Sequence, residues 1–276
     1  MKSLNYLNLF EDNNKILESN KALFIQVKKH KRIEERPLLD QIENGVFDRY
    51  STYLEQQKNL SSITTVNDYK DYEDIMRNSY KNSKFFNIER KKIFDSLPNG
   101  RKTICPYCLL SDSSTLDHYF PETFYVEYII FTPNLIPCCE KCNELKKTSI
   151  RRTIHFYFDE ISQETYLNIN IRVNSCIPVI YISLAPNTPN LIKNHFDQLQ
   201  LIDRYKEKAS DELTQILGML KRACLANQYD ECLEMFKYNI DYLKNTFGTN
   251  YWKACLLEAV LKSRKELLEA ITYGTI

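Results

Sequence analysis

The chain has 276 residues, 43% of them hydrophobic, and a formal net charge of +1. This length allows one to three domains with a packed core. The near-neutral charge excludes a protein that holds nucleic acid through bulk charge alone, because contacts of lysine and arginine to phosphate dominate such binding. Only five glycines occur, which favours a helix-rich chain with few tight turns.

We expect a cytoplasmic protein with no membrane partner. The first residues lack a basic stretch followed by an uninterrupted apolar one, so no secretory signal is indicated. No apolar run approaches the roughly 18 residues that a membrane-spanning helix needs.

Residues 1–98 are predicted to form a helical region. Apolar residues recur at three- and four-residue intervals in 39–53 and again in 66–80, as in amphipathic helices. A third helix near 85–97 is expected to stop at Pro98-Asn-Gly100, where a proline and a turn dipeptide coincide.

Two short runs near the start carry weaker signals. Residues 22–27 form a strand or the end of a helix, since a short apolar run does not distinguish the two. The basic run Lys28–Arg32 is expected to be a solvated face, with contact to nucleic acid or a partner as the alternative.

Residues 99–185 contain two CxxC pairs, Cys105 with Cys108 and Cys139 with Cys142. A CxxC knuckle lets two thiolates grip one zinc ion, and four thiolates leave no coordination position open. The sequence therefore predicts one structural Zn²⁺.

Cys138 is a rival of its neighbour Cys139, but it lacks the two-residue spacing to Cys142 and is expected to be a core residue. Nine cysteines less the four zinc ligands leave five, an odd number in scattered, mostly apolar contexts. This pattern favours a reducing compartment.

Four residues between and beside the cysteines predict a hydrolytic site. His118 is suited to be a general base that activates water for attack on a phosphodiester. Asp117 and Asn143 offer oxygen ligands of the kind that a catalytic Mg²⁺ or Mn²⁺ requires. Asn134 is expected to orient the His118 ring by accepting a hydrogen bond from one of its nitrogens.

Lys146 and Arg151 are the candidates for phosphate contact. They belong to a basic cluster around the predicted metal helix, for which a solvated helix face is the alternative interpretation.

Strands are predicted at 153–158, 166–173 and 179–184, where apolar residues gather or alternate. They would form a small sheet flanking the core. Pro186-Asn-Thr-Pro189 then breaks the chain, and residues 186–276 are predicted to be a C-terminal helical region.

The cysteine-rich segment resembles the HNH, or His-Me finger, nuclease superfamily. The resemblance rests on a CxxC knuckle followed by Asp117-His118-Tyr-Phe-Pro121, Asn134-Leu135 and Cys139-Glu-Lys-Cys142-Asn143-Glu-Leu-Lys146 in that order. It implies a ββα-metal fold in which the histidine is the general base, the middle asparagine positions it, and the aspartate and last asparagine hold one divalent ion. Asn143 stands where other members have histidine, which leaves the preferred metal open.

A looser similarity extends through His155-Phe-Tyr-Phe-Asp159, which resembles a run that follows the core in stand-alone bacterial HNH proteins. Phe156 replaces a proline of that run. His155 is expected either near the active site or in a structural role.

We therefore expect an α+β, mostly helical protein, with a zinc-stapled ββα-metal core and a flanking sheet between N- and C-terminal helical regions. The expected activity is that of an HNH endonuclease acting on DNA, with RNA as the other substrate. The resemblance to effectors of bacterial anti-phage defence implies a protein partner, such as an ATPase or sensor, or a homodimer. The alternative is a catalytically inert zinc ribbon that binds nucleic acid or protein, which leaves Asp117-His118, Asn134 and Asn143 as coincidences.

Overall fold

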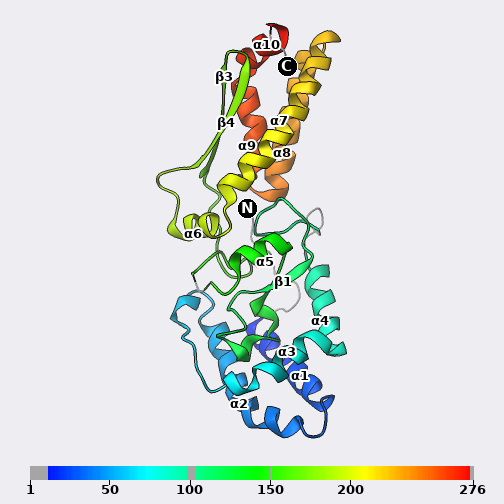
Figure 1. Ribbon diagram of the computed structural model, residues 1–276, viewed down its shortest axis with the longest axis vertical. Helices are drawn as coiled ribbons and strands as arrows, with labels where there is room; N and C mark the ends of the chain where they lie inside the picture. The colour runs from blue at the N-terminus through cyan, green and yellow to red at the C-terminus, as the bar shows by residue number, and fades with distance from the viewer. Residues whose placement is uncertain (1–11, 98–102, 150, 274–276) are drawn as a thin grey trace. The chain divides into compact units, whose positions relative to one another are not determined.

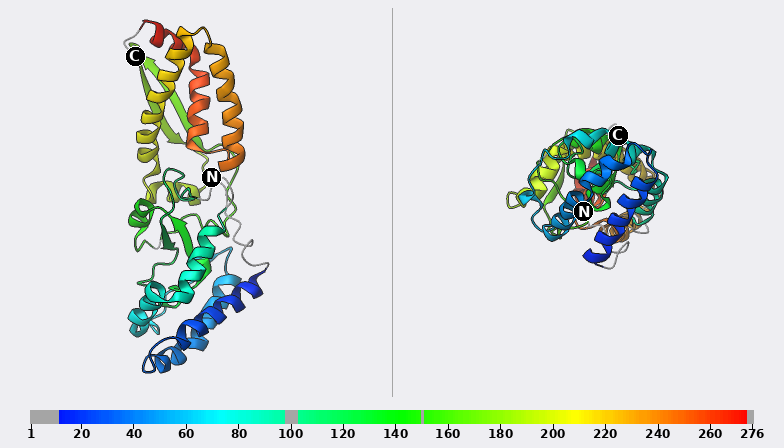
Figure 2. Two further views of the ribbon diagram at one scale, coloured as in Figure 1. Left: turned by 90° about the vertical axis from the view of Figure 1, so that its right-hand side faces the viewer. Right: turned by 90° about the horizontal axis from the view of Figure 1, so that it is seen from below.

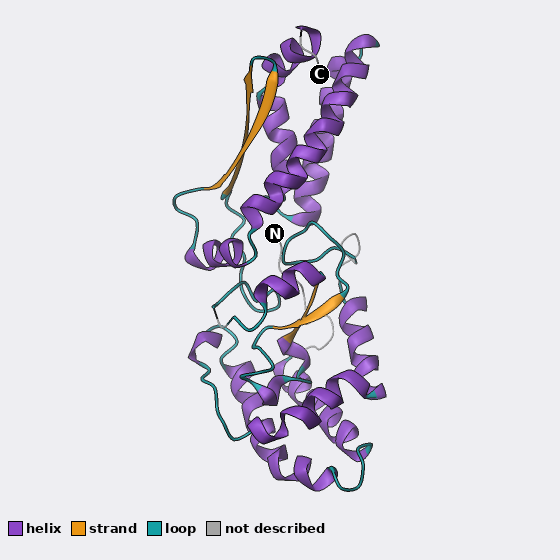
Figure 3. Ribbon diagram, in the orientation of Figure 1, coloured by secondary structure: helices purple, strands orange, loops and turns teal. Residues whose placement is uncertain are grey.

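The computed structural model describes residues 12–97, 103–149 and 151–273, and these form helices together with two small antiparallel sheets (Figures 1 and 3). The expected α+β, mostly helical class is confirmed. The chain divides into two compact units. The N-terminal unit comprises Ser3–Tyr107 and Ser111–Glu160, and the C-terminal unit is built mainly from Ile161–Ile276, to which Cys108–Leu110 also belongs.

The N-terminal unit begins with four helices, α1 (Asn13–Lys29), α2 (Arg36–Glu55), α3 (Glu73–Asn82) and α4 (Lys84–Asp95). The Asp12 carboxylate caps α1 by accepting from the Lys15 amide over 2.8 Å, and the Ser83 hydroxyl caps α4 in the same way. The run 22–27 is therefore helical, and 39–53 lies within α2 as predicted.

The other two predicted helices differ at their ends. The pattern at 66–80 becomes an α-helix only from Glu73, after a short 3₁₀ turn at Lys70–Tyr72. Helix α4 ends at Asp95, and the expected stop and domain boundary at 98–100 lie outside the described residues.

The basic run Lys28–Arg32 is not simply a solvated face. Lys28 pairs with Glu43 of α2, and the buried Lys31 donates to the Asn78 side chain over 2.8 Å. Two of its cations therefore hold helices together within the fold.

The rest of the N-terminal unit contains strands β1 (Thr115–His118) and β2 (Leu135–Cys138) and helix α5 (Glu140–Lys146). The strands pair antiparallel, with Thr115 opposite Cys138 and His118 opposite Leu135. Helix α5 packs on β1, and α4 packs on β2. Every residue of β2 is buried, which explains its uninterrupted apolar sequence.

Aromatic rings fasten the loop between β1 and β2 to α2. Tyr53 meets Phe120, Tyr128 and Phe131 edge to face, with ring centroids 5.0–5.4 Å apart, and Tyr50 stacks on Phe131 at 4.2 Å. Such pairs stabilise packing beyond the area they bury. They give the loop a fixed position over the helical region.

The C-terminal unit pairs strand β3 (Leu167–Asn174) with β4 (Ile177–Leu184), as predicted within one or two residues at each end. Five helices follow: α6 (Asn190–Gln198), α7 (Leu201–Leu225), α8 (Tyr229–Phe247), α9 (Trp252–Lys262) and α10 (Arg264–Tyr273). The hairpin lies along these helices, with β3 against α9 and β4 against α7 (Figure 2). No helix in the described parts of the chain combines the length and the apolarity needed to cross a membrane.

Two expectations about the flanking sheet are wrong. Residues 153–158 form no strand, because the backbone turns back on itself: the Phe158 and Asp159 amides both donate to the His155 carbonyl, at 3.0 and 2.9 Å. The Asp159 carboxylate closes the turn by accepting from the His155 amide at 2.8 Å. The remaining hairpin, β3 with β4, belongs to the C-terminal unit rather than to the cysteine-rich core.

Candidate functional site

The four predicted zinc ligands come together. Their Sγ atoms all lie within 4.8 Å of one another, and all four residues are buried: Cys105, Cys108, Cys139 and Cys142. Zinc binds thiolate sulfur at about 2.3 Å in a tetrahedron, so these sulfurs are close enough to hold one such ion. Cys139 is the N-cap of α5 and Cys142 lies in the first turn, which brings both to the start of one short helix.

Cys138 does not join this cluster. Its side chain is buried and its Sγ lies 3.3 Å from Thr115 Oγ1 across the β1–β2 pair. Burial raises the pKa of the thiol, which is the behaviour of a core residue.

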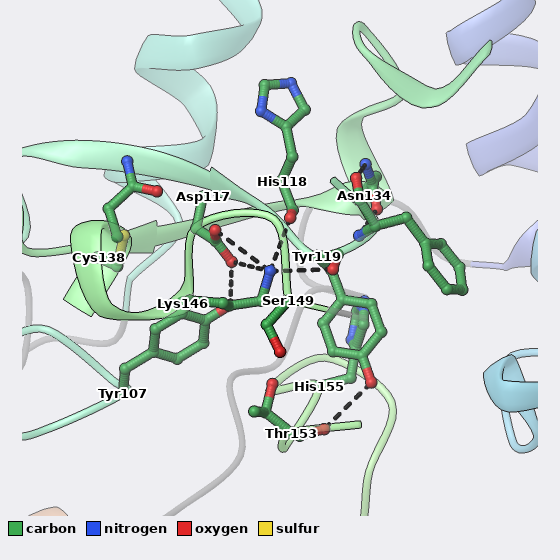
Figure 4. Close-up of polar contacts among 12 residues, drawn as sticks. Tyr107, Asp117, His118, Tyr119, Asn134, Cys138, Lys146, Ser149, Thr153 and His155 are labelled. Atoms are coloured by element: carbon green, nitrogen blue, oxygen red, sulfur yellow. Dashed lines mark hydrogen bonds and ion pairs between the residues drawn. The ribbon is translucent and has the colours of Figure 1, made fainter. Parts of the chain in front are cut away.

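His118 ends β1, and its ring is fixed by the loop that follows. Nε2 donates to the Ile129 carbonyl oxygen over 2.9 Å, because a carbonyl can only accept. In the neutral ring this assigns the hydrogen to Nε2 and a lone pair to Nδ1. Burial lowers the pKa of the imidazole, which favours the neutral ring. Figure 4 shows it projecting away from the Lys146 ammonium.

The expected hydrogen bond between Asn134 and the His118 ring is wrong. The Asn134 Oδ1 accepts from the Phe120 amide at 2.8 Å, and its Nδ2 donates to the carbonyls of Phe120 and Tyr128 at 3.1 and 3.3 Å. Asn134 is fully buried. It holds the backbone of the loop that supplies the Ile129 carbonyl. Asn134 therefore affects the His118 ring indirectly, through this loop.

Asp117 and Lys146 form a buried ion pair beneath the end of β1 (Figure 4). Lys146 Nζ lies 3.0 Å from Asp117 Oδ2 and also donates to the carbonyls of His118 and Tyr119, at 2.8 and 3.0 Å. The Tyr107 hydroxyl donates to Oδ2 as well, at 2.6 Å. Lys146 is 2% exposed, so its prediction as a phosphate-binding residue is wrong.

Arg151 does not lie in the cleft that contains His118. It lines a separate cavity of about 170 Å³ next to Tyr119 and Phe120. Its predicted phosphate contact stays a prediction, because the structure does not place this side chain at the cleft.

A cleft of about 580 Å³ brings the other predicted residues together, since Asp117, His118 and Asn143 all line it. Asn143 projects from α5, with its Nδ2 donating to Thr115 Oγ1 at 3.3 Å. The opposite wall of the cleft comes from the N-terminal helical region, for which the sequence predicts no functional residue. This wall is formed by Tyr80, Lys81, Arg90 and Phe94.

Asp117 and Asn143 carry side-chain oxygens of the kind that a small divalent ion binds. Asp117 Oδ1 has one distant partner, Lys146 Nζ at 3.3 Å, and Asn143 also lines the cleft. Mg²⁺ commonly takes one or two protein oxygens and fills its remaining positions with water and substrate phosphate. Asp117 and Asn143 are the residues that would hold it.

His155 lies in the core, not in the cleft. It is fully buried, and its Nε2 lies 3.1 Å from the Tyr53 hydroxyl, which donates in turn to Asn134 Oδ1 at 3.3 Å. Burial lowers its pKa to about 3. Of the two roles expected for His155, the structural one agrees with this position.

The protein ea31 of Escherichia phage lambda is similar to this chain, with 22% identical residues over 233 residues, covering 74% of each chain. No protein-family model matches the chain, and no solved structure matches it.

Proposed function

We propose that this protein is a metal-dependent endonuclease of the HNH type that hydrolyses phosphodiester bonds in DNA. The observation that carries the proposal is the position of His118: its Nε2 donates to the Ile129 carbonyl, in a cleft shared with Asp117 and Asn143. The order of β1, β2 and α5 beside a four-cysteine cluster supports it, since the resemblance implies the same order.

In the proposed reaction His118 accepts a proton from water at Nδ1. The water oxygen then attacks phosphorus, and the bond from phosphorus to the leaving oxygen breaks. Proton transfer by a positioned base contributes about 10²- to 10⁴-fold to such a rate. The lowered pKa of His118 favours the unprotonated ring, which is the form that can accept this proton.

A divalent ion held by Asp117 and Asn143 would supply charge neutralisation at the phosphate and the leaving oxygen. The chain's own contribution is to position these two side chains. Lys146 fixes the Asp117 carboxylate and the backbone at the end of β1, and Asn143 is held against Thr115. Positioning of this kind accounts for much of the catalysis of phosphoryl transfer.

The anti-phage role and the partner expected from the resemblance remain part of the proposal. The formal net charge of +1 supports recruitment by a partner, because a nuclease that finds DNA by itself gains from a strongly basic surface. Cleavage of DNA by the isolated protein at its full rate would contradict the partner-gated version.

Plasmid nicking with Mg²⁺ or Mn²⁺ tests the activity. We expect the parent protein to convert supercoiled DNA to open circles and His118→Ala to lose at least a hundredfold in rate. His30→Ala is the matched control, since His30 is exposed at the end of α1 and lines no part of the cleft. If zinc-loaded parent protein cuts neither DNA nor RNA, with or without its native partners, the inert zinc ribbon replaces the nuclease.

A further inference from the structure

Three cations line the cleft beside His118, namely Lys81, Arg90 and Lys147. None of them forms an ion pair with a carboxylate in the part of the chain that the structure describes. The two carboxylates of the cleft are already engaged, since Asp117 pairs with Lys146 at 3.0 Å and Glu122 with Arg77 at 3.4 Å. The cleft therefore has uncompensated positive charge.

Arg90 is the cation held most firmly. Its guanidinium carbon lies 4.8 Å from the Tyr80 ring centroid and 5.5 Å from that of Phe86. One terminal nitrogen donates to the Tyr80 carbonyl at 3.3 Å. Two rings and a carbonyl thus fix the plane of the guanidinium before any ligand arrives, which reduces the entropy lost on binding.

Arg90 still has hydrogen-bonding capacity to spare. Its Nε is buried and donates to no group that the structure describes, and the single bond to Tyr80 uses one of five N–H donors. Its other terminal N–H groups can donate to an anion with several acceptor oxygens.

Tyr80 connects this arginine to the candidate base. Its ring centroid lies 4.8 Å from that of His118, and the same residue stacks on the Arg90 guanidinium. The guanidinium and the imidazole are therefore both neighbours of the Tyr80 ring.

Two lysines add to the positive charge of the cleft. Lys81 lies at the end of α3 and Lys147 directly follows α5, and both are exposed. Three cations distributed over one cleft match a ligand with repeated negative charges rather than a single carboxylate.

We propose that Arg90 binds a phosphate of the nucleic-acid substrate next to the phosphodiester that the water activated by His118 attacks, and that Lys81 and Lys147 contact the flanking phosphates. This inference rests on the proposed function. It assigns phosphate binding to the wall formed by α3 and α4 and to the residue after α5, in place of Lys146 and Arg151.

Binding of labelled oligonucleotides to the full chain carrying His118→Ala tests the inference without cleavage. Affinity is measured for single- and double-stranded DNA over a range of salt concentrations, with Arg90→Gln, Lys81→Ala or Lys147→Ala added. Each variant should flatten the slope of log affinity against log salt by about 0.9 for duplex and about 0.7 for single strands. Arg90→Gln should also weaken binding about tenfold or more, and Arg90→Lys should restore the slope and part of the affinity.

Lys91→Ala is the matched control, because Lys91 is an exposed cation on the same helix that does not line the cleft. It should leave the slope unchanged. Thermal melting shows whether Arg90→Gln is folded. If it is not, the salt slopes of Lys81→Ala and Lys147→Ala test the inference instead. An unchanged slope in the folded variants, or an equal effect of Lys91→Ala, overturns the inference.

The nicking assay keeps this inference distinct from the proposed function. A parent protein that nicks DNA while the folded Arg90→Gln variant keeps its affinity and slope overturns only the phosphate assignment. A parent that binds DNA through Arg90 but never nicks it supports the phosphate site and contradicts the nuclease.

Discussion

The Nε2 atom of His118 donates a hydrogen bond to the carbonyl oxygen of Ile129, eleven residues further along the chain, over 2.9 Å. This bond sets the ring's tautomer, and its geometry depends on the loop between β1 and β2. Asn134 holds that loop through the backbone of Phe120 and Tyr128. The asparagine is therefore a positioning residue for the candidate base.

Asn134→Ala should lower the nicking rate at saturating DNA about a hundredfold while changing the DNA affinity little, because it releases the loop but not the substrate contacts. It should also lower the free energy of unfolding by about 1–3 kcal/mol, since it leaves buried backbone groups without partners. Steady-state nicking and urea unfolding measure the two effects. A variant that binds DNA weakly but turns over at the parental rate would contradict the positioning role.

Cys108→Ser should lower the zinc content well below one ion per chain and destabilise the cysteine-rich region, because metal-binding energy in such sites contributes to folding. Elemental analysis and thermal melting, each with and without a chelator, measure these effects. Cys224→Ser is the matched control, since Cys224 lies on α7 outside the four-cysteine cluster. Full zinc content in the Cys108 variant would exclude this residue as a ligand.

Arg49→Met should lower the free energy of unfolding by about 3–5 kcal/mol, because it leaves the carboxylate of Glu127 buried without its partner. The Glu127 side chain is 0% exposed and lies 2.7 Å from the Arg49 guanidinium. Arg49→Met combined with Glu127→Gln should recover much of this loss, as no buried charge remains. Urea unfolding of the parent, both single variants and the double variant gives the coupling between the two residues.

Acid should destabilise the protein through His155, whose pKa is lowered to about 3 by burial. An ordinary histidine has a pKa of about 6.5. Between these two pKa values His155 is therefore protonated in the unfolded chain but not in the folded one. Stability is therefore fully present above about pH 6.5 and falls as the pH drops toward 3, by up to about 1.4 kcal/mol per pH unit.

Urea unfolding at several pH values between 7 and 5 tests this dependence. His155→Gln should unfold with a shallower pH dependence than the parent, whatever its absolute stability. His30→Gln removes an exposed histidine and is the matched control. Equal slopes for the parent and His155→Gln would show that another group controls acid stability.

The sequence was most informative where spacing alone determines geometry. Two residues between cysteines suffice to bring the sulfurs of Cys139 and Cys142 close together, and alternation along β3 and β4 follows from the pleat of a strand. Both features are local in the chain. They were predicted correctly for that reason.

The errors concern residues whose role depends on distant partners. Lys146 was expected to face phosphate, but Asp117 and two carbonyls 27 and 28 residues earlier enclose its ammonium. The sequence around Arg90 indicates no ligand-binding role, because only the packing of α3 and α4 against the core brings this residue to His118. Residues 153–158 have strand-forming side chains, and the carboxylate of Asp159 overrides that tendency by closing a turn.

The hydrogen-bond acceptor behind the His118 ring is a neutral carbonyl, and no carboxylate in the described residues bonds to that imidazole. In the proposed reaction, an imidazolium formed by taking a proton from water would therefore be stabilised only by a dipole, inside a site that disfavours charge. Such a cation loses its proton readily. His118 would therefore be a weaker base, but its ring would return quickly to the neutral form between successive cuts.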